Sequence, residues 1–125
     1  MRRFLLLFLS FFVSLSMFAQ GTGNLKFTKK EHAFGKVPQS TPVTYSFEFE
    51  NTGTSPVIIE DAVAECGCTK PEFPKKPITK GKKGVISVTY DAKEAGAFTK
   101  KVTVTVVNSK DPVVLTITGE VVKAK

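Results

Sequence analysis

The residues of this chain best suited to chemistry are Cys66 and Cys68, its only two cysteines, which are separated by Gly67. Two thiols at this spacing could exchange disulfides with a partner, or could bind a soft metal ion such as Cu(I) or Zn(II) as thiolates. They could also form a local structural disulfide or stay as buried thiols. A disulfide here would close a loop of only three residues, which the loop-entropy relation values at roughly 1.6 kcal/mol. All of these roles remain open at this point.

Few other side chains could complete a reactive site. A closed zinc site uses four ligands, and beyond the two cysteines the chain offers one histidine, His32, distant in sequence. Nucleophilic catalysis needs a base beside its nucleophile, and no serine motif accompanies that histidine. We therefore expect no catalytic residue, no bound metal and no cofactor, and we do not expect an enzyme unless the cysteines carry out redox exchange.

A basic, proline-containing segment follows the cysteines. Between Thr69 and Gly84 the alternation of apolar and polar residues stops, and three prolines occur within seven residues, which is incompatible with a central strand. We predict a stiff, exposed loop whose aromatic residue folds back onto the core. Its candidate interaction residues are Lys70, Phe73, Lys75, Lys76, Lys80, Lys82 and Lys83.

The first residues predict export. Arg2 and Arg3 precede an apolar run that is too short to span a bilayer comfortably, which is typical of a secretory signal peptide over residues 1–19. Cleavage would leave one domain, residues 20–125, with no membrane span and a periplasmic or secreted location. Its cations are sixteen lysines against eleven acids, a balance of +5. Lysine lacks the planar fork with which arginine grips phosphate, so the charge favours solubility over specific anion recognition.

The remaining sequence predicts short strands. Apolar residues alternate with polar ones in five runs, and two shorter segments, 25–29 and the region around Val37, bring the total to about seven strands. This pattern predicts an all-β, immunoglobulin-like sandwich of two antiparallel sheets, and Gly119 predicts a bulge or a close backbone approach. The residues expected in the core are Tyr45, Phe47, Phe49, Ile86, Val88, Val102, Val104 and Leu115.

Four groups of residues, taken in order, resemble a known bacterial family. They are 32–37 (His-Ala-Phe-Gly-Lys-Val), 47–53 (ending Asn-Thr-Gly), 65–71 (containing Cys-Gly-Cys-Thr) and 81–90. The chain resembles the domain-of-unknown-function family 1573 (DUF1573), common among small exported proteins of Bacteroidetes-type bacteria. The resemblance implies an immunoglobulin-like sandwich related to Hydin-type (ASH-like) and sperm-protein-like scaffolding domains, and it implies no settled activity. Lys80-Gly81 stands where the family often has Pro-Gly.

Two functions of different classes follow. The first is a non-catalytic exported module that binds an envelope or secreted protein. The alternative is a small periplasmic protein that handles thiols and disulfides or a soft metal through Cys66 and Cys68. Nucleic acid is not expected as a partner, because the chain has no tryptophan and only two tyrosines for base stacking.

Overall fold

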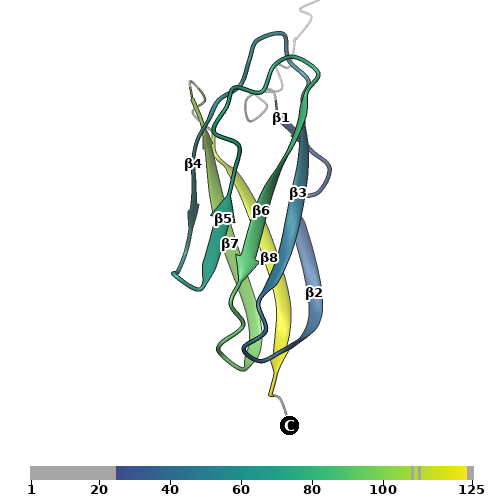
Figure 1. Cartoon of the computed structure of the whole chain (residues 1–125), viewed down its shortest axis with the longest axis vertical. Coiled ribbons are helices and arrows are strands. Elements are labelled where there is room, and N and C mark those ends of the chain that lie inside the picture. The colour runs from purple at the N-terminus through teal and green to yellow at the C-terminus, as the bar shows by residue number, and fades with distance from the viewer. Residues whose placement is uncertain (1–24, 108, 110, 124–125) are drawn as a thin grey trace, which may run out of the picture.

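The computed structural model describes residues 25–107, 109 and 111–123, and the regular structure in these residues consists entirely of β-strands (Figure 1). The predicted signal peptide, residues 1–19, and the predicted start of the domain at residue 20 lie outside the described residues. No helix in the described part is long and apolar enough to cross a bilayer. The strands are β1 (Leu25–Phe27), β2 (Glu31–Pro38), β3 (Val43–Asn51), β4 (Ile59–Ala64), β5 (Thr69–Glu72), β6 (Lys83–Tyr90), β7 (Gly96–Val106) and β8 (Val113–Val122).

The strands form two four-stranded sheets that pack face to face. One sheet has the order β1-β3-β6-β5 and the other β2-β8-β7-β4. All pairs are antiparallel except β2 with β8, which is parallel. The short segment between β1 and β2 carries the chain from one sheet to the other, so the first two strands serve different layers. The predicted immunoglobulin-like sandwich is therefore confirmed, with eight strands in place of about seven and with one parallel pair, β2 with β8, in sheets that were predicted to be antiparallel.

The strand that the sequence prediction missed is β5. The prolines of segment 69–84 favoured a loop from Thr69 onward, yet residues 69–72 pair with β6 as an edge strand. The amide of Asp91 donates to the carbonyl of Cys68, 3.0 Å away, and this fixes which β5 residues exchange hydrogen bonds with β6. By the alternation of an antiparallel pair, Lys70 and Glu72 bond to β6 and Pro71 does not. The missing amide of Pro71 therefore costs no hydrogen bond, as edge strands permit.

The core consists of the inward side chains of both sheets. Seven of the eight predicted core residues are buried, from Phe47 on β3 to Leu115 on β8. Tyr45 is the exception, because it lies at the side of the sandwich and is only half buried. The core has no tryptophan and no disulfide between the sheets, so aromatic and β-branched packing holds the layers together.

Gly119 confirms the predicted close approach of two backbones. A Cβ atom at this position would lie 2.8 Å from the ring of Phe98 and 3.0 Å from the carbonyl oxygen of Gly35. The bulge itself is on β2, where the pairing with β8 shifts between Ala33 and Lys36. Gly35 has a φ of +73° there, a conformation that favours glycine.

The topology separates two ends of the sandwich, which we name by their residues. The cysteine end contains the connections 39–42, 65–68 and 91–95. The lysine end contains the connections 52–58 and 73–82. Strand β5 runs from the cysteine end toward the lysine end. Each end has its own backbone hydrogen bonds, such as Ser40 to Ala92 at the cysteine end and Val57 to Ile78 at the lysine end. The two ends lie at opposite poles of the elongated molecule (Figure 1).

Candidate functional site

The cysteine pair forms the turn between β4 and β5. The structure joins Cys66 and Cys68 as a disulfide, with Cα atoms 5.2 Å apart, and Gly67 between them is exposed. The amide of Thr69 donates to the carbonyl of Cys66 at 3.3 Å, and the amide of Asp91 donates to that of Cys68 at 3.0 Å. The turn thus presents two half-buried sulfur atoms at one end of the sandwich.

Thr69 is the side chain that directly faces the sulfur atoms. It is buried, with only 3% of its surface exposed. Its Oγ1 atom lies 3.6 Å from the Sγ of Cys68 and 3.9 Å from the Sγ of Cys66. Sequence analysis did not select Thr69 as a site residue, although it belongs to the Cys-Gly-Cys-Thr group that carries the family resemblance. Its position directly after the pair was the available signal.

A pocket of about 230 Å³ opens beside the disulfide. Tyr90 forms one wall, and its ring stacks on Phe98 with centroids 4.1 Å apart. Burial raises the pKa of Tyr90, and the neighbouring carboxylates of Asp91 and Glu94 raise it further, so its phenol stays protonated at neutral pH. The complete lining is Cys66, Cys68, Tyr90, Asp91, Lys93, Glu94 and Lys100. The pocket lining therefore includes two lysines and two acidic residues in addition to the cysteines.

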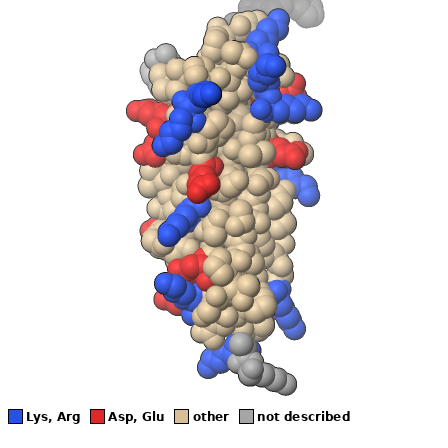
Figure 2. All heavy atoms as spheres, in the orientation of Figure 1, with Lys and Arg blue, Asp and Glu red and all other residues tan. Residues whose placement is uncertain are grey.

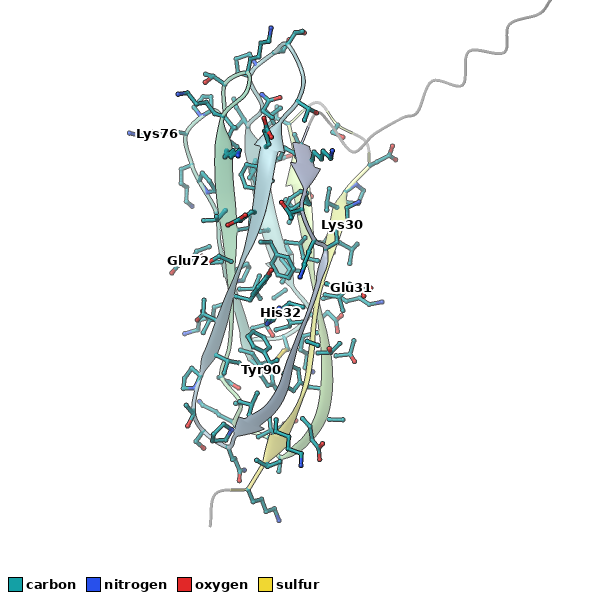
Figure 3. All side chains as sticks on the ribbon, turned by 90° about the vertical axis from the view of Figure 1, so that its right-hand side faces the viewer. Lys30, Glu31, His32, Glu72, Lys76 and Tyr90 are labelled. Atoms are coloured by element: carbon teal, nitrogen blue, oxygen red, sulfur yellow. A yellow bond between two sulfur atoms is a disulfide. The ribbon has the colours of Figure 1, made fainter. Side chains whose placement is uncertain are left out.

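His32 does not join the cysteines. It lies on β2 at the side of the sandwich where β2 passes β3, with its ring stacked on Tyr45 at 3.7 Å and edge-on to Phe34 at 4.7 Å (Figure 3). Burial lowers the pKa of His32, and the positive charge of Lys29 lowers it further. Within the described residues, no three His, Cys, Asp or Glu side chains come together as metal ligands.

The second candidate site is the lysine end. Lys75, Lys76, Lys80, Lys82 and Lys83 are all exposed there. On the face drawn in Figure 2, the largest group of basic side chains lies at this end, and Lys76 points out into solvent in Figure 3. In the described part of the chain, none of the five forms an ion pair with a carboxylate. Lys83 lies opposite Glu50 across the β3–β6 pair, whereas the charge of the other four lysines is available to a partner.

Phe73 behaves as predicted. It is half buried and packs against the core, and the Nζ atom of Lys75 lies 4.9 Å from the centre of its ring. Phe73 therefore anchors the start of the 73–82 connection to the core and does not offer an exposed aromatic surface. Lys70 is exposed but lies on β5, nearer in sequence to the cysteine turn than the five lysines of the lysine end are.

Asn51 fixes the connections of the lysine end. It has no exposed surface, and its Nδ2 donates to the carbonyls of Ser55 at 2.9 Å and Ile78 at 2.8 Å. Its Oδ1 accepts from the amide of Gly53 at 3.0 Å. One side chain thereby joins the β3–β4 turn to the β5–β6 connection, and the buried Ile78 pairs with Val57 beside it. In the sequence, Asn51 stood out only as part of the Asn-Thr-Gly group of the family resemblance, and this cross-connection was missed.

The two candidate sites are separate. The sequence predicted a basic loop directly after the cysteines, but four residues of β5 intervene and carry the chain away from them. The disulfide and the five exposed lysines of the lysine end therefore cannot contact one small ligand together.

Residues 25–121 match the family described as "Protein of unknown function (DUF1573)", and the chain belongs to this family. The resemblance seen in the sequence is thus confirmed. No curated protein sequence matches the chain.

Solved structures share the fold at low sequence identity. The ASH/PapD-like domain 7 of human CEP192 has a TM-score of 0.67 at 11% identity, over 83% of this chain and 89% of that domain. A protein of unknown function from Porphyromonas gingivalis W83 has a TM-score of 0.68 at 12% identity, over 84% of this chain and 50% of that one. The VesB protease of Vibrio cholerae has a TM-score of 0.63 at 13% identity, over 81% of this chain and 33% of the protease. These similarities establish a PapD-like, immunoglobulin-like sandwich and no activity.

Proposed function

We propose that this chain is an exported, non-catalytic interaction module whose lysine end binds an acidic surface of an envelope or secreted protein. The observation that carries the proposal is a group of exposed lysines on a fixed backbone connection. Five exposed lysines lie on and beside a connection that is held by the buried residues Asn51 and Ile78, and in the described part of the chain no carboxylate pairs with them.

A fixed connection is better suited to binding than a loose one. Ordering a loop on binding costs conformational entropy, and a loop that is already ordered avoids most of this cost. Here the β5–β6 connection is tied to the β3–β4 turn through Asn51, and the amide of Gly81 donates to the Asn51 carbonyl at 2.9 Å. The lysines are therefore presented from a rigid base even though each ammonium group remains mobile.

The chemistry of lysine indicates how such a surface would act. An ammonium group is a hydrated point charge that attracts anions without fixing their geometry. Its contribution acts mainly on the association rate and weakens as salt screens the charge. A scaffolding role of this kind agrees with what the DUF1573 resemblance implies, and it needs no reactive group. The predicted signal peptide would place the module in the periplasm or outside the cell.

The test compares two variants that lose the same number of charges. Replacing Lys75, Lys76, Lys82 and Lys83 with Gln removes charge from the lysine end. Replacing Lys36, Lys93, Lys101 and Lys123 with Gln removes four exposed charges elsewhere. Both variants should keep the wild-type unfolding midpoint, because surface substitutions usually change stability by less than about 0.5 kcal/mol.

Capture from an envelope extract at low salt is the measurement. We expect the lysine-end variant to recover much less of the partner than the wild type, and the control variant to recover nearly as much. Equal losses in both variants would show that net charge alone drives capture, and this result would contradict the proposal.

A further inference from the structure

The turn at the cysteine end is supported by hydrogen bonds in addition to the bond between its sulfur atoms. Backbone hydrogen bonds fix Thr69 to Cys66 and Asp91 to Cys68. Glu65, just before the turn, is tied to Lys101 twice, through its amide at 3.3 Å and through its Oε1 at 3.0 Å. A three-residue disulfide ring removes little entropy from the unfolded chain. The covalent bond is therefore poorly explained as a structural staple.

The surroundings of the sulfur atoms are better suited to a reaction of the disulfide than to a structural role. Both cysteines line an open pocket of about 230 Å³, so a partner's side chain can approach them. The buried hydroxyl of Thr69 lies beside both sulfur atoms and nearer to that of Cys68. A hydroxyl at this position can donate a hydrogen bond to a thiolate, and such a bond lowers the pKa of the thiol. The lining of the same pocket includes two lysines, Lys93 and Lys100, and two acidic residues, Asp91 and Glu94.

We propose that the Cys66–Cys68 disulfide accepts electrons from a dithiol of a partner protein by thiol–disulfide exchange. One partner thiolate attacks the Sγ of Cys66, which breaks the Cys66–Cys68 bond and leaves the electron pair on the Sγ of Cys68. The hydroxyl of Thr69 donates to that thiolate. The second partner thiol then loses its proton and attacks the partner's own sulfur in the mixed disulfide, which releases the Sγ of Cys66 as a thiolate. The partner dithiol is oxidised to a disulfide, Cys66 and Cys68 are reduced to two thiols, and the two protons of the partner end on them.

The direction of attack follows from the packing around the two residues. Cys68 packs against the hydrophobic core, which leaves the Sγ of Cys66 the easier one for a partner to reach, and the Sγ of Cys68 is the one closer to the Thr69 hydroxyl. A leaving thiolate departs faster when its pKa is lower. The thiolate of Cys68 is therefore the better leaving group, and the Sγ of Cys66 is the atom that the partner attacks. This site lies at the opposite end from the lysine surface, so the inference does not depend on the proposed function.

Thr69 provides the first test. Protein purified from the full chain is reduced with dithiothreitol, and the exchange rate is measured for Thr69→Val, Thr69→Ser and the control Thr44→Val, whose hydroxyl contacts only Thr89. We expect Thr69→Val to slow exchange by about threefold, because it should raise the pKa of the Cys68 thiol by about one unit and the exchange rate follows only about half of such a change. Thr69→Ser should stay close to the wild type, because it keeps the hydroxyl. Equal slowing by both Thr69 variants, or no change in either, would overturn the assignment.

A second measurement locates the attacked sulfur. The oxidised protein is mixed briefly with reduced glutathione, free thiols are blocked with N-ethylmaleimide, and the peptide containing both cysteines is fragmented in a mass spectrometer. We expect glutathione on Cys66 and the maleimide on Cys68. A disulfide that resists glutathione and dithiothreitol, or an adduct mainly on Cys68, would overturn the proposal.

Discussion

Among single residues, Asn51 has the widest structural role. Its side chain makes three hydrogen bonds to three different backbone groups, while its own backbone bonds to Gly81 and Lys82. Because these groups are buried or partly buried, water cannot readily replace a missing partner. Asn51 therefore couples the stability of the fold to the shape of the lysine end.

This coupling predicts a large effect of Asn51→Ala. The substitution removes the side-chain partner of the Ser55 carbonyl and of the Gly53 amide, and it leaves the Ile78 carbonyl with only the amide of Val57. We expect unfolding to become easier by about 3 kcal/mol. Urea titration measures the change. The control is Ser46→Ala, which removes only the exposed hydrogen bond to Ser87 and should cost less than about 0.5 kcal/mol. Similar midpoints for the two variants would show that Asn51 is not a structural centre.

His32 predicts a pH dependence. Its pKa is lowered in the folded protein, by burial first and by Lys29 second, from an ordinary value of 6.5. Below about pH 6.5 the unfolded chain binds the proton more readily, so the free energy of unfolding should fall as the pH falls from 7.5 to 5.5. As His32 is the only histidine, His32→Gln should flatten the slope of urea midpoint against pH in this window. An unchanged slope in the variant would assign the dependence to other groups.

At the scale of elements, the β2 bulge and Gly119 act together. The carbonyl of Gly35 and the ring of Phe98 both occupy the space where a side chain at position 119 would begin. We expect Gly119→Ala to destabilise the fold by about 1 to 3 kcal/mol through overpacking.

The matched control for this prediction is Gly67→Ala in the cysteine turn. Nothing lies within 4 Å of a Cβ atom at Gly67, so this variant should unfold close to the wild-type midpoint in thermal denaturation. A neutral Gly119→Ala would mean that Phe98 can move aside without cost, contrary to the close packing described above.

The sequence predicted the strands wherever burial imposed an alternation. Runs such as Val43–Asn51 have one buried face, so their periodicity was visible before the structure was known. The strand β5 was missed because an edge strand of four residues needs little alternation and tolerates Pro71. Tyr45 shares the inward register of β3, but its ring lies at the side of the sandwich. The spacing of apolar residues shows which face of a strand points inward, and it does not show how near a residue lies to the edge of the sheet.

The candidate sites were predicted only in part. The two cysteines and the lysines were identifiable by residue type, whereas Thr69, Asn51 and the pocket around Tyr90 depend on contacts between distant segments. Asn51 meets Ile78, and Cys68 meets Asp91, only because the sheets bring their connections together. The prediction also placed the lysines beside the cysteines because they are close in sequence. In the structure, β5 lies between them and carries the 73–82 connection to the opposite end of the sandwich.

At the scale of the whole molecule, the sandwich acts as a rigid spacer between two surfaces of different chemistry. The lysine end offers exposed positive charge, and the cysteine end offers a disulfide beside a pocket. Because the core between them is continuous and tightly packed, changes at one end should leave the structure of the other intact. We therefore expect that substitutions at one end abolish the function of that end and leave the function of the other end unchanged.

The most direct test is partner capture by three proteins side by side: the wild type, the Lys75, Lys76, Lys82 and Lys83→Gln variant, and the Cys66→Ser, Cys68→Ser variant. The cysteine variant should remain folded, with stability lowered by less than about 2 kcal/mol. We expect it to recover the envelope partner as well as the wild type does at low salt, while the lysine-end variant loses most of the recovery. Full recovery by the lysine-end variant, together with loss of recovery by the cysteine variant, would contradict the account and place the binding surface at the disulfide.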